Sequence, residues 1–357
     1  MTSYWTHEGY ELVVGLEVHV ELETRTKLFS HAPNRFGDEP NTNVTPVCTG
    51  MPGALPVLNK QAVELAIRLG LALECEIRPS TFHRKNYFYP DMPKDFQISQ
   101  YDLPICNEGR LVLPDGFVVG IERAHLEEDT GKTTHVGGAG RIHDADYALV
   151  DYNRSGVPLL EIVSHPDIRA PEQARAYVDG LRDILLATEV SDARMEEGSM
   201  RVDANVSVRP IGSTELRTRC EVKNLNSIRS VGRAIEYEAR RHVDIYEAGA
   251  EPHQETRHWD EASGRTSSLR SKEEAHDYRY FTEPDLVPLS PSDAWIDRVR
   301  SELPVLPAQR RTDLAAALGT DEADCAVVVS RGLDGLLMGV LEAGADPKRV
   351  LVHATNN

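Results

Sequence analysis

The sequence is short of cysteine and of long apolar runs, and each shortage excludes a class of protein. Its 357 residues include only 5 cysteines, an odd number that is widely scattered, which indicates reduced thiols rather than a disulfide framework. No apolar run is long enough to cross a bilayer, and the N-terminus lacks the basic and then apolar pattern of a signal peptide. We therefore expect a cytoplasmic protein that does not span a membrane.

Positive charge is also scarce. Lys and Arg number 39 against 57 Asp and Glu, which gives a formal net charge of −18. A protein this acidic is repelled by a phosphate backbone, so any RNA that it handles must meet a local basic surface or be recognised by shape. Apolar residues make up 40% of the chain, which is enough to bury a sizeable core and excludes a disordered protein.

Three common sequence signatures are missing as well. The chain has no GxxxxGK[ST] phosphate loop, no GxSxG nucleophile turn and no CxxC pair. Their absence argues against a P-loop kinase, a serine hydrolase of the α/β type and a zinc knuckle.

Strand patterns occupy the first part of the chain and helical patterns the last part. Residues 11–23 alternate apolar and polar side chains, and further strand patterns occur at 117–128, 157–163 and 200–209. Helices are expected at 60–74, from Pro171 and from about Ile228 and, after a proline-rich segment at 284–291, at 292–303, 307–318, 321–330 and 333–343.

This order predicts an α+β fold followed by a small all-α domain. The sheet is expected to be mixed or antiparallel and to carry carboxylates on one face. We place the catalytic domain at residues 1–290 and a helical domain at 291–357, which we expect to be incomplete because the chain stops within an apolar element.

Acidic residues and a histidine gather at polar positions of the predicted strands. They are Glu17, His19, Glu127 or Glu128, Glu161 and Asp203. Several carboxylates stay ionised side by side only near a compensating cation. Oxygen ligands with one imidazole favour Mg²⁺ or Mn²⁺ over Zn²⁺, and Mg²⁺ is commonly shared with substrate phosphates. The pattern predicts a divalent-cation site that handles phosphate.

Glu161 and His125 also have a plainer interpretation. His125 is more readily explained as a histidine that supports the fold than as a metal ligand. Glu161 lies in an otherwise apolar strand, where an unpaired carboxylate is costly, so it is either a catalytic residue or the partner of a buried arginine.

Local charge and aromatic residues give two further signals. Between residues 217 and 241 the chain is locally basic; the residues that could face tRNA or phosphate are Arg217, Arg219, Lys223, Arg229 and Arg233. The alternative is a salt-bridged helix face. The stretch 84–91 mixes basic and aromatic residues and could either stack a nucleobase or belong to the core.

Taken together, long stretches of the chain resemble the GatB family, the B subunit of the tRNA-dependent aspartyl/glutamyl amidotransferase. The resemblance runs from about residue 9 to the end, and its main stretches are residues 15–22 (GLEVHVEL), 36–44, 52–59, 84–91 (RKNYFYPD), 97–100, 125–132 (HLEEDTGK), 151–161, 195–199, 222–227 and 277–281.

The resemblance implies a catalytic body with a glutamine synthetase-like fold and a carbon–nitrogen ligase that uses glutamine as amido donor. Such a protein uses ATP and Mg²⁺ to phosphorylate the side-chain carboxylate of Glu on tRNA(Gln) or of Asp on tRNA(Asn). Ammonia then displaces the phosphate. The partners implied are an amidase (glutaminase) subunit, a small third subunit of the same complex and the misacylated tRNA.

The resemblance also assigns residues. It implies metal ligation by His19, Glu128 and Glu161, and nearby catalytic roles for Glu17, Glu127 and Asp203. Lys85 resembles the family's lysine on the ammonia path.

The sequence departs from the family in three places, of which one, Thr282 before Glu283 where proline is usual, is expected to have little effect. Many members carry zinc-binding cysteines near the N-terminus, whereas here only Cys48 remains, so we expect no zinc. We expect the family's tail domain, which helps to grip the tRNA, to be absent.

Two alternatives stay open at this point. One is a free-standing glutamine synthetase-like ligase that joins an amine to a small carboxylate substrate. The other is a non-catalytic protein that serves as a tRNA-binding scaffold within a complex.

Overall fold

A computed structural model describes residues 4–137, 145–271 and 278–356 of the chain. Its eight helices are α1 (Lys60–Ala72), α2 (Pro171–Ala187), α3 (Ile228–Glu247), α4 (Asp293–Ser301), α5 (Pro307–Leu318), α6 (Glu322–Ser330), α7 (Asp334–Glu342) and α8 (Pro347–Asn356). Its strands are β1 (Thr6–His7), β2 (Tyr10–Glu21), β3 (Glu76–Ile77), β4 (His83–Asn86), β5 (Phe96–Ser99), β6 (Cys106–Val112), β7 (Val118–Glu128), β8 (Lys132–Val136), β9 (Tyr147–Asp151), β10 (Pro158–Ser164), β11 (Met200–Pro210), β12 (Cys220–Leu225), β13 (Glu255–Asp260), β14 (Arg265–Ser271) and β15 (Phe281–Thr282).

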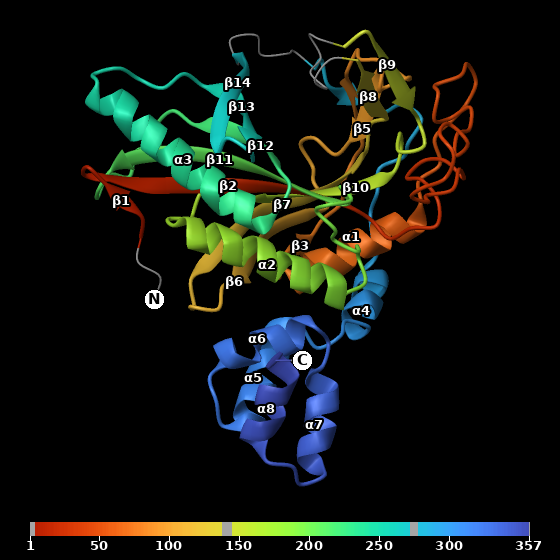
Figure 1. Cartoon of the computed structure of the whole chain (residues 1–357). Coiled ribbons are helices and arrows are strands. Elements are labelled where there is room, and N and C mark those ends of the chain that lie inside the picture. The colour runs from red at the N-terminus through yellow and green to blue at the C-terminus, as the bar shows by residue number, and fades with distance from the viewer. Residues whose placement is uncertain (1–3, 138–144, 272–277, 357) are drawn as a thin grey trace.

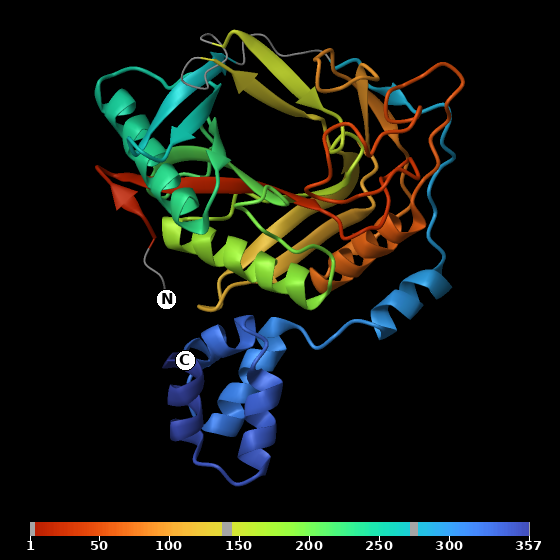
Figure 2. The same ribbon diagram turned by 45° about the vertical axis from the view of Figure 1, so that its right-hand side comes forward.

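One 13-stranded sheet organises the body. Its main path runs β14-β13-β12-β11-β2-β10-β7-β5-β4-β15, and β8 and β9 form a separate hairpin. Strands β12 and β13 pair in parallel, whereas β2, β7, β10 and β11 pair antiparallel. The expected α+β class with a mixed sheet is therefore confirmed. Figure 2 shows the sheet bending around the face opposite the helices, with the β8–β9 hairpin across from β2.

The two faces of β2 explain why the sheet has one apolar and one polar side. Leu12, Val14, Leu16, Val18 and Val20 are fully buried, and they belong to a hydrophobic core that also takes in residues of α1, α2 and α3. These three helices lie along the same side of the sheet (Figure 1). The alternate positions of β2 therefore point away from the helices, into the concave side.

Local signals place the helix starts where the sequence predicts them. The side chain of Asn59 accepts a hydrogen bond from the amide of Gln61 at the start of α1, and Ser227 accepts one from Ser230 at the start of α3. Pro171 occupies the first position of α2, where its missing N–H costs nothing. The 24–58 segment contains no helix or strand, as its Pro, Gly and Asn content predicts.

The C-terminal helices divide between two hydrophobic clusters. Helix α4 packs on α1, where Trp295 Nε1 donates to Glu64 at 3.1 Å and Arg298 pairs with the same carboxylate at 2.6 Å. Val299 belongs to the core of the body, whereas a second cluster begins at Leu314 and joins α5 to α8. Figure 1 shows α5 to α8 as a group below the sheet and its helices.

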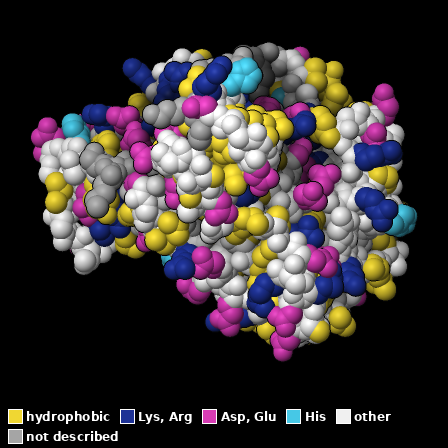
Figure 3. Space-filling model, turned by 90° about the horizontal axis from the view of Figure 1, so that it is seen from below, with side chains coloured by type: hydrophobic (Ala, Val, Ile, Leu, Met, Phe, Trp, Pro, Cys, Tyr) yellow, Lys and Arg dark blue, Asp and Glu magenta, His cyan; other side chains and the backbone are white. Residues whose placement is uncertain are grey.

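The lower face of the molecule mixes charges of both signs. Asp and Glu side chains alternate with Lys and Arg over this face rather than sorting into separate regions (Figure 3). Within the described residues, no helix combines the length and the apolar character that a membrane crossing requires.

Candidate active site

Four neighbouring strands bring the predicted acidic residues together on the polar face of the sheet. Glu161 on β10 lies directly across from His19 on β2 and, on its other side, from His125 on β7. Asp203 on β11 lies across from Glu17 on β2. Because side chains alternate along each strand, all of these groups project from the same face. We call this set of residues, with Glu127 and Glu221, the carboxylate face.

His19, Glu127 and Glu161 form the first cluster of possible metal ligands. The Nε2 atom of His19 lies 3.6 Å from Glu127 Oε1 and 3.5 Å from Glu161 Oε2, and one ligand atom from each residue lies within 4.8 Å of the others. All three side chains stay partly accessible, at 20%, 6% and 15%. One imidazole with two carboxylates is a donor set that suits a hard divalent cation.

Electrostatics hold this cluster in an anionic state. Burial opposes the charged form of His19, but the carboxylates of Glu161 and Glu127 outweigh it and raise the histidine pKa to about 9. Burial likewise raises the pKa of Glu161, but His125 and His19 overcome it and hold that pKa well below its usual range. Glu161 is thus an ionised carboxylate between two imidazoles, with His125 Nε2 at 3.2 Å.

Glu128 lies apart from this cluster. It follows Glu127 on β7 and therefore points to the opposite side of the strand. Its carboxylate is buried, pairs with Lys94 Nζ at 2.7 and 2.5 Å, and accepts a hydrogen bond from the amide of Ile98 at 3.0 Å. The structure therefore differs from the expected ligand set: the carboxylate beside His19 and Glu161 is that of Glu127.

A second acidic cluster lies next to the first on the same face. Glu17, Asp203 and Glu221 bring carboxylate oxygens within 4.8 Å of one another. Lys223 Nζ lies 2.5 Å from Asp203 and 2.8 Å from Glu221, and these two carboxylates outweigh burial and raise the lysine pKa. Burial, reinforced by Glu161, raises the pKa of Glu17.

A pocket of about 440 Å³ opens over this face. Its lining includes His19, Glu127 and Asp203 together with three basic residues, Lys85, Arg201 and Lys223. Burial disfavours the charged form of Lys85, but the negative charge of Glu127 prevails and raises the lysine pKa. The pocket therefore combines anionic groups that can hold a cation with cationic groups that can hold an anion.

Three residues of this site were not predicted from the sequence. Arg201 pairs with Asp129 at 2.8 Å and lines the pocket, and Asp129 also pairs with Arg154 at 3.3 Å. Glu221 completes the second acidic cluster. A signal was available for Arg201, because it shares the polar alternation of β11 with Asp203. Glu221 alternates with Lys223 in the same way on β12, a strand too short to stand out.

The basic stretch between residues 217 and 241 divides between several environments. Lys223 faces the second acidic cluster, Arg233 forms an ion pair with Glu261, and Arg229 is exposed. Arg217 stacks its guanidinium over Tyr246 at 3.5 Å, and with Arg219 it lines a smaller pocket of about 130 Å³ that also contains Glu17.

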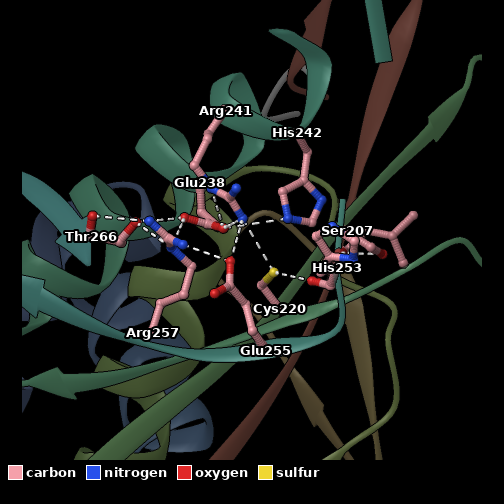
Figure 4. A network of polar contacts seen from close by, with 10 residues as sticks. Ser207, Cys220, Glu238, Arg241, His242, His253, Glu255, Arg257 and Thr266 are labelled. Carbon is pink, nitrogen blue, oxygen red and sulfur yellow. Dashed lines mark hydrogen bonds and ion pairs between the residues drawn. The ribbon is translucent and has the colours of Figure 1, made fainter. Parts of the chain in front are cut away.

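A third group of possible metal ligands lies on the helix-covered side of the sheet. Cys220, Glu238 and His242 are buried and bring their ligand atoms within 4.8 Å. Here arginine already supplies the positive charge: Arg241 donates to Glu238 at 2.5 Å and lies 3.3 Å from Cys220 Sγ, and Arg257 approaches Glu238 at 3.5 Å (Figure 4). This network stabilises the packing of α3 on the sheet and leaves little need for a metal.

Cys48 lies in a polar environment without a second cysteine beside it among the contacts described for it. Ser30 and Thr45 each place a hydroxyl 3.5 Å from its Sγ, and Lys27 Nζ lies 3.7 Å away. Burial opposes ionisation of this thiol, but its hydrogen bonding with Thr45 and Ser30 outweighs burial and lowers the pKa of Cys48. The expectation that the chain binds no zinc stays a prediction.

Most of the chain is similar to known proteins. A family model described as "GatB/GatE catalytic domain" matches residues 12–297. The curated relatives include a protein of Rhodococcus jostii that is 58% identical over 349 residues, which cover 95% of this chain and 69% of the relative. Proteins of Nocardioides sp. and Thermobifida fusca are 55% and 54% identical and are covered over 70% and 68% of their length. All three are named as the B subunit of an aspartyl/glutamyl-tRNA(Asn/Gln) amidotransferase.

Proposed function

The chain belongs to the family of GatB/GatE catalytic domains, and from this membership and the carboxylate face we propose that it forms the side-chain amide on a misacylated tRNA. The substrates in this proposal are Glu-tRNA(Gln), Asp-tRNA(Asn) or both, in accord with the names of its relatives. The observation that carries the proposal is the pocket whose lining combines His19 and Glu127, two members of a possible metal-ligand cluster, with three basic residues.

The residues present fit a magnesium ion. His19 and Glu127, which line the pocket, and Glu161, whose Oε2 lies 3.5 Å from His19 Nε2, would hold it, because they offer hard donors. When bound, Mg²⁺ would neutralise charge on the phosphoryl group that is being transferred. This ligand set replaces Glu128 of the sequence-based expectation with Glu127, because the carboxylate of Glu128 is bound by Lys94 behind the strand.

In the proposed reaction, ATP activates the carboxylate and ammonia then displaces phosphate. An oxygen of the substrate carboxylate bonds to the γ-phosphorus of ATP while the bond from that phosphorus to ADP breaks. Ammonia then forms a C–N bond to the acyl carbon as the C–O bond to phosphate breaks, and inorganic phosphate leaves. A carboxylate is a poor acyl donor, and the phosphate supplies the leaving group that it lacks.

The chain's own side chains have distinct parts in this proposal. Lys85, Arg201 and Lys223 would hold the anionic phosphates and substrate carboxylate, which otherwise repel each other. Glu17, whose pKa burial raises, is suited to take a proton from the attacking nitrogen. Asp203 would orient Lys223, to which it is bound.

The remaining parts of the assignment are proposals too. We propose that the body has a glutamine synthetase-like fold and that residues 1–290 and 291–357 form separate domains, with α4 docked on the body as described above. Ammonia would come from an amidase (glutaminase) subunit, assembled with a small third subunit, and the basic residues Arg217, Arg219, Lys223, Arg229 and Arg233 would face tRNA or phosphate. The cytoplasmic location stays a prediction.

A reconstituted assay tests the function. The protein, assembled with the glutaminase and its small partner, is given Glu-tRNA(Gln) or Asp-tRNA(Asn) with and without ATP, and amide formation is measured. We expect ATP-dependent amidation of at least one of these tRNAs. Equal turnover of free glutamate would instead favour a free-standing ligase, and unchanged amidation by Glu161→Ala would favour a scaffold.

A further inference from the structure

A row of aromatic side chains leads from the surface to the rim of the pocket. Tyr101 stacks on Tyr280 with ring centroids 4.0 Å apart and planes only 12° from parallel. Tyr280 in turn meets Tyr278 edge to face at 6.0 Å, and Tyr278 lines the pocket. Lys85 Nζ lies 4.8 Å from the centre of the Tyr278 ring, so the inner end of the row contacts one of the basic residues that line the pocket.

The backbone fixes this row in place. Tyr101 follows β5 and Tyr280 precedes β15, and both strands pair with β4 on its two sides. Asn86, at the end of β4, donates from its backbone amide to the carbonyl of Tyr278 at 3.0 Å and from its side chain to the same carbonyl at 2.9 Å. The stack is thus built on paired strands rather than on a single loop.

The outer ring of the stack is accessible. Although Tyr280 covers one face of Tyr101, 56% of Tyr101 remains exposed. Nearby in sequence to Lys85, Phe88 and Tyr89 are also exposed, at 73% and 47%, so these aromatic residues of the 84–91 stretch lie at the surface and not in the core. Unpaired nucleobases commonly stack on aromatic rings that remain accessible, as the ring of Tyr101 does.

We propose that Tyr101 and Tyr280 form a stacking platform for the unpaired base at the 3′ end of an RNA substrate. The proposal rests on the proposed function, because an amino acid esterified to the last nucleotide carries that nucleotide to the rim of the pocket when its carboxylate enters. Electrostatics agree with this proximity: burial raises the pKa of Tyr280, and Glu127 and Glu161 of the carboxylate face raise it further.

The adenine of ATP is the other base that could reach the site, and the structure favours the RNA. Lys223, which is proposed above to hold phosphates, and the second acidic cluster that it contacts belong to β2, β11 and β12. The tyrosine platform flanks β5 and β15, at the other end of the order of strands. The two nucleotides would thus approach the carboxylate face from different sides.

A spectroscopic experiment tests the platform independently of catalysis. The probe is an RNA acceptor-stem hairpin with an unpaired 3′ tail whose last base is 2-aminopurine, a fluorescent adenine analogue that is quenched when it stacks. We expect the protein, with its partner subunits, to quench the probe. Tyr101→Ala should weaken binding about 5- to 150-fold, since one base stacked on one aromatic side chain contributes that much.

Matched variants separate stacking from other effects. Tyr101→Phe keeps the ring and should bind the probe like the parent protein, and Tyr101→Trp enlarges the ring and should bind more tightly. Tyr4→Ala is the control, because Tyr4 is similarly exposed at 53% but belongs to the N-terminal segment beside Phe117. Thermal unfolding of each variant confirms that the fold is kept.

The outcomes are distinct. Unchanged quenching and affinity in Tyr101→Ala, or no quenching by the parent protein, would overturn the platform. If Tyr101→Ala raises the KM for ATP as much as the KM for misacylated tRNA, the base on the platform is that of ATP, and the proposal is again wrong. Failure of amidation by the parent protein concerns the proposed function alone, since the fluorescence readout requires no turnover.

Discussion

Two clusters of acidic and histidine side chains lie on opposite sides of one sheet, and their charge balance differs. In the buried network beneath α3, Glu238 and Glu255 are matched by Arg241 and Arg257. On the carboxylate face, Glu17, Glu127, Glu161, Asp203 and Glu221 crowd together, and the ammonium of Lys223 contacts two of them.

The comparison shows how the same residue types serve stability in one place and function in another. Where each carboxylate has an arginine, the network is complete and is expected to hold the fold together. Where carboxylates crowd without an arginine for each, burial and neighbouring charges disfavour the ionised form of Glu17, and a bound cation would relieve this repulsion. The histidines follow the same division, since His242 lies fully buried beside Glu238 whereas His19 borders the pocket.

The largest expected effect is loss of activity on the carboxylate face. Glu161→Gln keeps the shape of the side chain but removes the charge between His19 and His125, so we expect amide formation to fall by about 10³-fold, or about 4 kcal/mol of transition-state stabilisation. The initial rate with saturating ATP and tRNA measures it. Glu23→Gln, an exposed change just beyond β2, is the control and should retain full activity.

The next effect is on stability and belongs to the opposite face. Glu238→Gln removes one of the two carboxylates that Arg241 and Arg257 share, so the free energy of unfolding should fall by about 3 kcal/mol. Urea denaturation measures the change. The folded variant should keep its metal response, and a fall in that response equal to that of Glu161→Gln would contradict the division between the two clusters.

Acid should act on the same network. Burial raises the pKa of Glu238, but His242 and Arg241 overcome it and lower the pKa from 4.5 to about 2. A carboxylate with a depressed pKa stabilises the fold above its unfolded value of 4.5, and this contribution is lost as the pH falls towards 2. Urea denaturation at a series of pH values should therefore show a steeper loss between pH 4.5 and pH 2 in the parent than in Glu238→Gln.

Mg²⁺ should stabilise the protein by binding to the carboxylate face and not to the network beneath α3. At ten times its dissociation constant, Mg²⁺ is expected to add about 1.4 kcal/mol to the free energy of unfolding. Differential scanning calorimetry with Mg²⁺ and with EDTA measures the shift. Glu161→Gln should abolish it, and Glu128→Gln is an informative second variant because the proposed ligand set excludes Glu128. Loss of the shift in Glu128→Gln without loss of stability would restore Glu128 as a ligand.

The smallest effect tests whether the ionised form of Glu17 destabilises the fold. Burial and neighbouring carboxylates raise the pKa of Glu17, so its ionised form destabilises the fold at neutral pH. Without metal, Glu17→Gln should therefore increase the free energy of unfolding by no more than about 1 kcal/mol while it lowers activity. A decrease in stability would show that Glu17 is held by its hydrogen bond from Asn205 more strongly than its neighbours repel it.

The long elements of this fold could be predicted from the sequence because one regular pattern specifies each. The alternation in β2 and β11 and the caps at Asn59 and Ser227 are confirmed. The short strands, such as β4, β5 and β15, were missed, since two to four residues carry no readable period and pair only through distant partners.

Prediction of the site from the sequence is limited in the same way, by contacts between strands that are distant in the sequence. Alternation could place Glu17, His19 and Asp203 on polar faces, but at Glu127 and Glu128 the choice depends on which face of β7 is polar at its end. Pairing with β10 decides it, because Leu159 lies across from Glu127 and fixes that position on the side of Glu161. Arg201 and Glu221 become part of the site because β11 lies beside β2 in the sheet and β12 lies beside β11. No local sequence pattern specifies this order of strands.

The central position of β10 has a consequence for local unfolding of the molecule. This strand is paired on both sides, with β2 and with β7. Glu161 is therefore held between His19, which is more than a hundred residues away in the sequence, and His125, which is much nearer. Edge strands such as β14 and β15 can open locally without disturbing those pairings. Amide hydrogen exchange should thus find β10 among the last segments to exchange, and the cluster should be lost only in forms in which β10 itself has opened.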